Sequence, residues 1–388
     1  MPRLRFRVLE GREVFREHAA PWMDLLRRSG EPSFFLRGDW LATWAATCAP
    51  NGRHCLAIGE RDGRWVAGAP LTIGTALLGR KRMVEQLAFA GGPWFDRMEV
   101  PAETPEDLAE FLGLLVDWFH ADHRSCQALS LRELPTEDKT YRILARMEAE
   151  ADFKPHFELV SRAPMVVLDS GGRLSDRYAR KLRASRRRLE GLGRPEFRFF
   201  LPSAEDCDRI LAEIKEVEDR SWKGAQQVGV FRDGAPYRFF SALWRRLVPL
   251  GDIALATLRL DGRLVAYHWG FRHRGRFLAY NLAQLPEADE YTAGLLLLDH
   301  IVCHGRDLGF DIVDASRGSL DTPNFIGAYH GPVREHMAAT IYGRGLRASV
   351  LSLMRHTVFP TARRLLGREQ PAPRRRPEEP DGQGPGEA

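Results

Sequence analysis

A twelve-residue segment occurs twice in this chain of 388 residues, and the two copies start 199 positions apart. Residues 56–67 read LAIGERDGRWVA and residues 255–266 read LATLRLDGRLVA. In each copy apolar residues flank an Asp-Gly pair, which is a strong signal for a β-hairpin with a two-residue turn. Unrelated Asp-Gly hairpins would share these residues too, so the segments before the two hairpins are needed to decide whether a module is repeated. A short amphipathic helix precedes each copy at the matching distance, at residues 40–44 and 239–244, which favours a repeated module.

The same order of elements is predicted after each hairpin. The hydrophobic patterns indicate a strand, a helix and a second strand, at residues 84–90, 105–120 and 127–132 and again at 276–284, 294–306 and 310–315. An antiparallel hairpin followed by a β-α-β crossover is typical of an α/β module with a mixed sheet. The chain is therefore predicted to contain two modules of this kind.

Four segments are predicted: two modules, an amphipathic C-terminal helix and a disordered tail, at residues 1–155, 156–345, 346–366 and 367–388. The join between the modules is expected around residues 150–165, where Pro155 and Pro164 flank a polar stretch. Pro360 would break the C-terminal helix. The tail is rich in proline, arginine, glutamate and glycine, a composition that predicts disorder.

Two further helices are predicted between the join and the second hairpin. The second starts at a capping-box-like pair, Ser203 and Asp206, and has an apolar face that includes Trp222. The first, at residues 175–192, is amphipathic and rich in arginine. Residues 177–194 contain eight basic side chains and one acid, a net charge of +7, whereas the whole chain has a net charge of +5. This helix could contact the phosphate backbone of a nucleic acid, or it could be a solvated face.

Composition and motifs exclude several classes of protein. With 44% hydrophobic and 28% charged residues, the chain is neither disordered nor fibrous. It lacks the GxSxG, P-loop and GxGxxG motifs of nucleophile-elbow hydrolases, Walker NTPases and Rossmann enzymes. Its five cysteines form no CxxC pair, and His300 and His304 lack a third ligand in register, so no metal site is predicted.

The expected location is the cytoplasm. The N-terminal residues, MPRLRFR, lack the apolar run of a signal peptide. The longest uncharged stretch, residues 65–79, is too short to span a bilayer. An odd number of cysteines fits reduced thiols better than a disulfide framework. No transmembrane segment is therefore predicted.

The second crossover offers a candidate anion site. The segment 291–302, YTAGLLLLDHIV, leads from a loop through Thr292, Ala293 and Gly294 straight into an apolar helix. Backbone amides at such a helix start, with the helix dipole behind them, suit a pyrophosphate. The same residues are equally compatible with an ordinary helix entry.

Four short motifs in this order resemble the BioF2-like acetyltransferase domain, a GNAT-superfamily group that includes CelD-type proteins of cellulose biosynthesis. They are RSWKG at residues 220–224, DGRLVA at 261–266, YTAGLLL at 291–297 and GFDIVDASRG at 309–318. The resemblance is strongest over residues 150–335, and the basic helix fits it as well. It implies a tandem GNAT-like α/β fold, each module a mixed sheet flanked by helices, related to the FemAB aminoacyl transferases of peptidoglycan synthesis.

The resemblance implies that acetyl-CoA, or another acyl-CoA, binds with its pyrophosphate on the amides of Thr292, Ala293, Gly294 and Leu295. The sequence departs from the family in two places. Only Gly294 of the usual signature is present, without the earlier Gln or Arg and glycine. Ile326 stands where relatives often have a lysine after an aromatic residue.

A GNAT reaction needs a base for the attacking amine, an acid for the leaving thiolate and a group that polarises the thioester carbonyl. Tyr329 is the candidate acid, and Asp314 is the candidate base or orienting group. Tyr280 is a third catalytic candidate. Four further side chains are expected on the substrate side of the cleft: Trp222, Lys223, Asn281 and Arg317. Each of these residues could instead serve a structural role.

The function that follows is an N-acyltransferase, which would move an acyl group from an acyl-CoA to a small-molecule amine. The amine could be an amino sugar or another precursor in envelope or exopolysaccharide metabolism. One alternative is a FemAB-like transferase with aminoacyl-tRNA as donor, bound through the basic helix 177–194. A second is a catalytically silent accessory protein that keeps the fold for binding. The acceptor, the acyl chain length and the oligomeric state are not predicted.

Overall fold

The computed structural model describes residues 3–30, 33–78, 82–122, 126–150, 155–168, 174–320 and 324–358. Its first half contains β1 (Arg5–Glu10), α1 (Val14–Glu17), α2 (Ala19–Arg28), α3 (Gly38–Cys48), β2 (Arg53–Arg61), β3 (Arg64–Leu78), β4 (Arg82–Phe89), α4 (Pro105–Asp122), β5 (Ala128–Pro135) and α5 (Lys139–Glu150). Its second half contains β6 (His156–Val167), α6 (Asp176–Leu192), β7 (Pro195–Phe200), α7 (Cys207–Arg220), α8 (Trp222–Gln226), α9 (Ala235–Leu247), β8 (Ile253–Leu260), β9 (Arg263–His273), β10 (Arg276–Gln284), α10 (Ala293–His304), β11 (Ile312–Asp314), β12 (Val333–Tyr342) and α11 (Leu346–Leu353).

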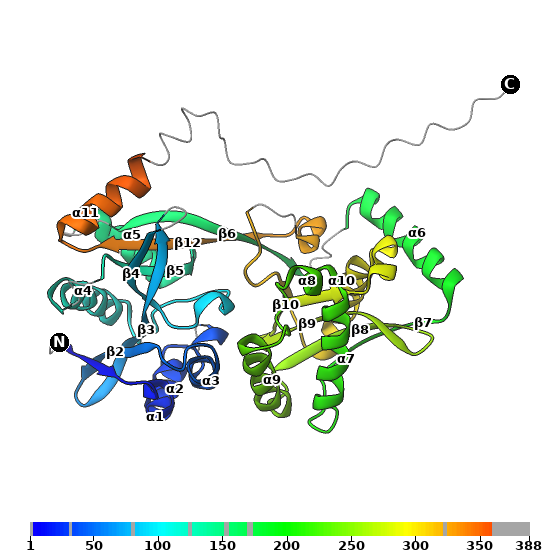
Figure 1. The fold of residues 1–388 in the computed structure, drawn as a ribbon, viewed down its shortest axis with the longest axis horizontal. Coiled ribbons are helices and arrows are strands. Elements are labelled where there is room, and N and C mark those ends of the chain that lie inside the picture. The colour runs from blue at the N-terminus through cyan, green and yellow to red at the C-terminus, as the bar shows by residue number, and fades with distance from the viewer. Residues whose placement is uncertain are drawn as a thin grey trace.

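The strands of the described residues form one twelve-stranded sheet in the order β1-β2-β3-β4-β5-β12-β6-β11-β10-β9-β8-β7. Two pairs, β4–β5 and β10–β11, are parallel and each follows a hairpin, so both predicted crossovers are present. Figure 1 shows the N-terminal half on the left and the C-terminal half on the right, with β6 and β12 running between them. The predicted α/β class, with a mixed sheet flanked by helices, is confirmed.

The two predicted hairpins are confirmed and match in detail. Asp62 and Gly63 have φ angles of 52° and 76°, and Asp261 and Gly262 have φ angles of 49° and 82°. Positive φ at both central residues is the requirement of a type I′ turn, which Asp-Gly meets at low cost. Each hairpin also has a register shift at the equivalent place, Gly59/Glu60 in the first and Leu258/Arg259 in the second. The repeat therefore extends to the irregularities of the strands.

Equivalent helices of the two halves pack against each other. Trp40 of α3 meets Phe239 of α9 edge to face, with ring centroids 5.2 Å apart. Phe34 stacks on Phe271 at 4.5 Å, and both rings are buried. At the edge of this apolar contact, Arg37 forms an ion pair of 2.8 Å with Asp252. The core of the molecule is thus continuous across the two halves.

The segment expected to join the modules is itself a strand of the sheet. β6 begins directly after Pro155, and Pro164 lies inside it, opposite Val333 of β12. The Pro164 carbonyl accepts a hydrogen bond of 3.0 Å from the amide of Ala315. A proline is tolerated in a strand where no ladder bond needs its missing N–H. The expected join therefore overlaps β6, with Pro155 directly before this strand and Pro164 inside it, while residues 151–154 lie outside the described residues.

The helix predicted to start at Ser203 and to include Trp222 ends earlier in the structure. Ser203 and Asp206 form the expected reciprocal pair in the turn before α7: Ser203 Oγ donates to Asp206 Oδ2 at 2.9 Å and accepts from the Asp206 amide at 3.2 Å, but neither side chain caps an amide of the helix itself. The helix ends at Arg220, however, because Ser221 caps the new helix α8 by accepting a hydrogen bond of 3.1 Å from the Lys223 amide. Trp222 is therefore not on the buried face of α7 and is 54% exposed.

The C-terminal helix is described only in part. α11 continues into a π-helical turn, Met354–Val358. The rest of the predicted helix to residue 366, with Pro360, and the predicted tail 367–388 lie outside the described residues. No helix in the described ranges combines the length and the apolar character needed to cross a membrane.

Candidate active site

Strands β10 and β11 diverge after a short parallel contact. They pair over three residues only, Arg276–Leu278 of β10 against Ile312–Asp314 of β11. β10 continues to Gln284, still paired with β9, but no described strand pairs with its other edge beyond Leu278. An unpaired strand edge presents backbone N–H and C=O groups that an extended ligand can bind. The two strands are therefore unpaired from Leu278 onward, along the part of β10 that ends at Gln284.

A β-bulge lies where β10 leaves β11. The register against β9 shifts between Ala279 and Asn281, so Tyr280 is the extra residue and its backbone stands outside the ladder. The Tyr280 ring lies 5.1 Å from that of Trp269, and Asn281 Nδ2 donates to the Tyr267 hydroxyl at 3.0 Å. Trp269 and Tyr267 share one face of β9 because they are two residues apart. The bulge therefore brings Tyr280 and Asn281 to the same face, as the predicted cleft requires.

The four residues predicted to hold a pyrophosphate lie together at the start of α10. Thr292 has a left-handed backbone, with φ 46°, and directly precedes the helix, which begins with Ala293, Gly294 and Leu295. A Cβ atom on Gly294 would lie 2.8 Å from Leu282 Cδ2, so glycine allows the helix to pack closely on β10. Amides at a helix start carry partial positive charge and favour an anion.

The start of α10 already holds a hydrogen-bond acceptor. Gln284 Oε1 accepts from the Gly294 amide at 2.6 Å, and Gln284 Nε2 donates to Asp289. The Leu295 amide donates to the Thr292 carbonyl at 2.9 Å. A carboxamide oxygen therefore occupies a position that a phosphate oxygen would take. The sequence reasoning missed Gln284 because it lies on the strand, ten residues before Gly294.

The basic helix α6 packs onto the same helix start. Ser185 Oγ lies 3.0 Å from Thr292 Oγ1, and Leu182, Ser185 and Leu189 form the buried face of α6. All eight cationic side chains of residues 177–194 are exposed. None of them forms an ion pair with a carboxylate of the described chain. A surface of unpaired positive charge therefore borders the predicted pyrophosphate site.

Asp314 lies at the end of β11 with its side chain fully buried. Its carboxylate accepts hydrogen bonds from Arg97 at 3.0 Å and from Arg334 at 2.8 Å, and Arg276 lies 3.4 Å away. Burial raises the pKa of Asp314, but the two closest arginines outweigh it and lower the pKa to about 2. So weak a base is unsuited to take a proton from an amine. Both roles predicted for Asp314, base or orienting group, stay predictions, and a pKa of about 2 fits the orienting role better.

A second carboxyl group near the bulge, that of Asp96, has a raised pKa, in contrast to the lowered pKa of Asp314. Asp96 follows the short 3-10 turn η2 (Gly92–Trp94) and is 8% exposed. Burial raises its pKa to about 7, although Ser316 and Arg317 beside it act to lower the pKa. The Tyr280 hydroxyl donates to the Trp94 carbonyl at 2.5 Å and so ties this loop to the bulge. A carboxyl group with a pKa near neutrality can act as a base at physiological pH.

Glu133, at the end of β5, completes the charge cluster between the two halves. Its carboxylate forms an ion pair of 2.7 Å with Arg317 and lies 3.3 Å from His336 Nδ1. The Glu133 side chain is buried, whereas that of Arg317 is 39% exposed and reaches solvent. We call this set the module junction: Asp96, Arg97, Glu133, Asp314, Ser316, Arg317, Arg334 and His336.

Lys223 and Asn281, both predicted on the substrate side, belong to one buried network. Lys223 Nζ donates to Asn281 Oδ1. Asn281 Nδ2 and the Tyr267 hydroxyl donate to Glu218 Oε2 at 2.6 and 2.9 Å. Burial lowers the pKa of Lys223 to about 8, against the raising effect of Glu218. This lysine, directly beside the bulge, therefore has a proton to give near neutral pH.

The structure does not link Tyr329 to the module junction. Its hydroxyl donates to Asp299 Oδ1 at 3.0 Å, and burial, followed by the Asp299 charge, raises the pKa of Tyr329. Asp299 lies about 7.5 Å along α10 from Gly294, given a rise of about 1.5 Å per residue. No described hydrogen bond connects Tyr329 with Asp96, Tyr280 or Asp314, so its role as the acid stays a prediction.

A metal centre has no candidate ligands in the part of the chain that the structure describes. No group of three or more His, Cys, Asp or Glu side chains there is placed to hold a metal ion.

The sequence matches a known domain family over part of its length. Residues 176–322, from the start of α6 to the loop after β11, match a family model described as an acetyltransferase (GNAT) domain. No curated protein matches the chain at a significant level.

Two solved structures have a similar fold over most of the chain. One is the C-terminal DUF2156 domain of a protein from Agrobacterium fabrum that is provisionally named a lysylphosphatidylglycerol synthetase. It aligns with a TM-score of 0.51 and 15% identity over 89% of this chain and 96% of that one. The other is FemX, with a TM-score of 0.51 and 10% identity over 85% of this chain and 96% of that one. At such identities the likeness concerns the fold alone. The chain therefore has the fold of these two structures, and its residues 176–322 match the model of the GNAT acetyltransferase domain.

Proposed function

We propose that this protein is an N-acyltransferase that transfers an acyl group from an acyl-CoA, in the first instance acetyl-CoA, to the amine of a small molecule. The observation that carries the proposal is the unpaired edge of β10, which runs from the bulge at Tyr280 to the start of α10. A pantetheine chain extended along this edge would bring the thioester to the bulge. The pyrophosphate would then meet the amides of Ala293 and Gly294 once Gln284 moves aside.

The reaction joins the acceptor nitrogen to the acyl carbon and breaks the carbon–sulfur bond. The attacking ammonium group must lose a proton, and Asp96, with a pKa of about 7, accepts it. The backbone of Tyr280, free of the ladder, is available to polarise the carbonyl. Lys223, with a pKa of about 8, gives a proton to the leaving thiolate and, once neutral, takes the second proton that the acceptor nitrogen loses as the amide forms. Asp314 and its arginines hold the Asp96 loop against β11.

The module junction is the proposed acceptor site. Its buried carboxyls, Asp96 and Glu133, attract a cationic amine. The half-exposed guanidinium of Arg317 can pair with an acidic group on the same molecule. The BioF2-like resemblance suggests amino sugars of envelope and exopolysaccharide metabolism as substrates, and an amino sugar that carries a phosphate or a carboxylate would meet both requirements.

Acetyl-CoA is expected to raise the melting temperature of the protein, because a ligand that binds only the folded state stabilises it. The stabilisation should be about 2.7 kcal/mol at a ligand concentration 100 times the Kd. Gln284→Ala should increase the shift, since it removes the competing acceptor at Gly294. Gln284→Glu should abolish it, because a fixed carboxylate repels the pyrophosphate. Thermal-shift titration measures both effects.

Gln226→Glu is the matched control, since Gln226 is an exposed residue at the end of α8. Its titration should equal that of the wild-type protein. If neither acetyl-CoA nor longer acyl-CoAs shift any of these proteins at millimolar concentration, the acyl-CoA proposal is wrong.

An aminoacyl-tRNA donor is the alternative, and the exposed cations of α6 favour it. They border the start of α10 without carboxylate partners, which suits a polyanion larger than CoA. We expect tRNA binding, if it occurs, to weaken steeply with salt. Reversing three charges, with Arg180→Glu, Arg183→Glu and Arg187→Glu together, should lower the slope of log K against log salt by about 2–3.

Electrophoretic mobility shifts at several salt concentrations measure this slope. The control reverses Arg209, an exposed arginine that already pairs with Asp206 and Glu213 on α7. Absence of tRNA binding at low salt, together with stabilisation by acyl-CoA, would eliminate the alternative.

A further inference from the structure

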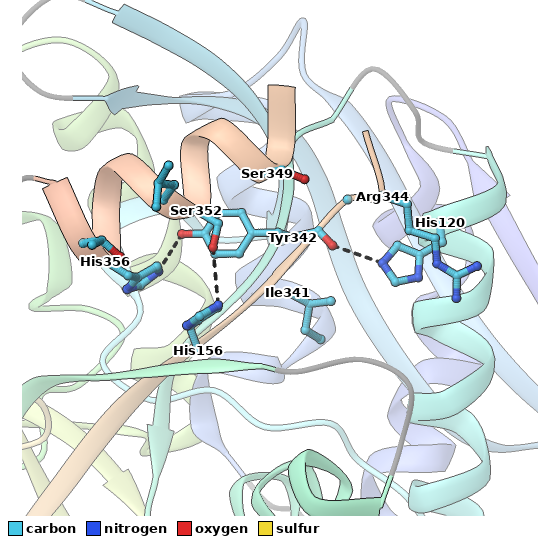
Figure 2. A pocket seen from close by; sticks show the side chains of 11 residues that line it. His120, His156, Ile341, Tyr342, Arg344, Ser349, Ser352 and His356 are labelled. Carbon is cyan, nitrogen blue, oxygen red and sulfur yellow. Dashed lines mark hydrogen bonds between the residues drawn. The ribbon is translucent and has the colours of Figure 1, made fainter. Parts of the chain in front are cut away.

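A polar pocket lies between α4 of the N-terminal half and the elements β6, β12 and α11, far from the module junction. It has a volume of about 460 Å³ and is formed by the ends of α4 and β12, the start of β6, and α11 with the turn that follows it. Figure 2 shows how His120, His156 and His356 converge on Tyr342 from three different elements. Tyr342 is separated from Arg334 of the junction by about 26 Å along β12, at about 3.3 Å per residue.

The lining of this pocket is basic. Three imidazoles and the guanidinium of Arg344 face it, together with the hydroxyls of Tyr342 and Ser352. No aspartate or glutamate is among its described lining residues. A site with many donors and no carboxylate favours an anionic ligand.

His120 has an unused ring nitrogen. Its Nε2 lies 3.1 Å from the Tyr342 carbonyl oxygen, and because a carbonyl can only accept, this nitrogen carries the hydrogen. The other nitrogen, Nδ1, is buried and has no hydrogen-bond partner among the described residues. Once protonated, the ring would present a free N–H donor at Nδ1, which an anion could satisfy.

His156 and His356 lie against each other on the opposite wall. Their rings are stacked, with centroids 4.2 Å apart and planes inclined by 9°. His356 Nε2 lies 2.8 Å from the Tyr342 hydroxyl, and His156 Nε2 lies 3.4 Å from Ser352 Oγ. Burial, then the neighbouring His156 and Arg355, lowers the pKa of His356, whereas Glu158, which pairs with Arg355 beside the pocket, acts to raise it. A bound anion would compensate the charge of both rings and so reverse this effect.

We propose that this pocket binds a phosphate group, carried either by a soluble phosphate monoester or by a lipid headgroup. Donors reach it from α4, β6, the end of β12 and the turn after α11, an arrangement that matches the several oxygens of a tetrahedral anion. The lipid source is included because the outer face of α11 exposes Leu346, Val350 and Leu353 at 82%, 46% and 56%. The proposal stands independently of the acyl transfer at the module junction.

Calorimetric titration of the full chain with inorganic phosphate tests the pocket. We expect saturable binding that is about tenfold tighter at pH 6 than at pH 8, because only protonated imidazoles carry charge. His356→Gln and Arg344→Gln should each abolish binding without lowering the melting temperature, since both side chains are exposed. His304→Gln, on α10 and paired with Asp307, is the control and should bind like the wild type.

Two further binding experiments distinguish a soluble phosphate monoester from a lipid headgroup as the natural ligand. Glycerol 3-phosphate represents a soluble monoester, and vesicles of phosphatidylglycerol in phosphatidylcholine, compared with phosphatidylcholine alone, represent a lipid headgroup. Either source supports the proposal if His356→Gln abolishes its binding. The proposal is overturned if none of these probes binds, if the two variants bind as the wild type does, or if the histidines bind Zn²⁺ and phosphate has no effect.

Discussion

Replacing Asp96 with asparagine is expected to lower kcat for acyl transfer by about 10²–10⁴-fold, the usual contribution of a general base. The carboxyl group has the right pKa, about 7, and lies in the loop that Tyr280 ties to the bulge. Asparagine has the same shape but cannot accept a proton, so acyl-CoA binding should be unchanged. Steady-state kinetics and thermal shift on the same preparation separate the two effects.

The pH dependence gives a second readout for Asp96. In the wild-type protein kcat/KM should rise with pH up to about 7, as Asp96 becomes ionised. The folded pKa also exceeds the unfolded value of about 3.9, so the folded state retains a proton that the unfolded state releases. The free energy of unfolding should therefore fall as pH rises from about 4 to 7, and Asp96→Asn should lack this loss.

Tyr329→Phe is the competing variant. If it abolishes turnover while Asp96→Asn does not, the chemistry lies at the Tyr329–Asp299 pair and the assignment of Asp96 is wrong. If both variants transfer normally, neither residue handles the proton. A protein that binds acyl-CoA but transfers nothing to any amine would be the silent accessory protein.

Replacing Arg97 with methionine is expected to destabilise the fold by about 3–5 kcal/mol, because it leaves the buried carboxylate of Asp314 short of a partner. Arg97 Nη2 donates to both carboxylate oxygens at 3.0 Å and also to the Ser316 carbonyl at 3.2 Å. It is also the contact through which the N-terminal half holds the end of β11. Urea unfolding at pH 7 measures the loss.

Arg162→Met is the control for this prediction. Arg162 pairs with Glu335 at 2.9 Å, but both side chains are about half exposed, so its loss should cost less than about 1 kcal/mol. Equal effects of the two substitutions would contradict the account of the junction.

Acid unfolding separates the same two variants. The folded pKa of Asp314, about 2, lies below its unfolded value of about 3.9. Its contribution to the free energy of unfolding is therefore complete above pH ~4 and is lost as pH falls toward about 2. Arg97→Met should make this loss smaller, because it removes part of the cause of the depressed pKa.

The elements of the fold could be predicted because their signals are local. Asp261 and Gly262 supply the positive φ angles of their turn wherever they occur, and Ser203 accepts from the Asp206 amide, three residues on, in the turn before α7. The strand predicted at residues 276–284 matches β10. Because the same order of elements occurs twice, 199 positions apart, each hairpin and the crossover after it could be assigned to one module.

The module junction could not be predicted, because its members come from opposite halves of the chain. Asp96 and Glu133 meet Arg317 only because β12 returns to lie between β5 and β6. The run around Asp96, GGPWFDR at residues 91–97, contains no motif that marks a base. The pKa of a carboxyl group depends on its burial and on the charges around it, so Asp96 and Asp314 have very different pKa values within one site. Of the two, only Asp314 lies in a motif that could be recognised in the sequence.

The donor site could be predicted in part. Thr292, Ala293 and Gly294 are recognisable from their place before an apolar helix. The hydrogen bond that the Gln284 side chain accepts from the Gly294 amide could not be predicted, because Gln284 reaches it from a different element. The bulge at Tyr280 could not be predicted either, because a bulge is defined by pairing with a partner strand and not by the sequence of one strand.

A crystal structure of the protein with bound CoA tests the central claim most directly. The proposal predicts the pyrophosphate on the amides of Ala293 and Gly294, with Gln284 displaced, and the pantetheine arm along β10 with its sulfur at the Tyr280 bulge, facing Asp96. CoA bound at another surface, or no CoA bound at saturating concentration, would contradict it.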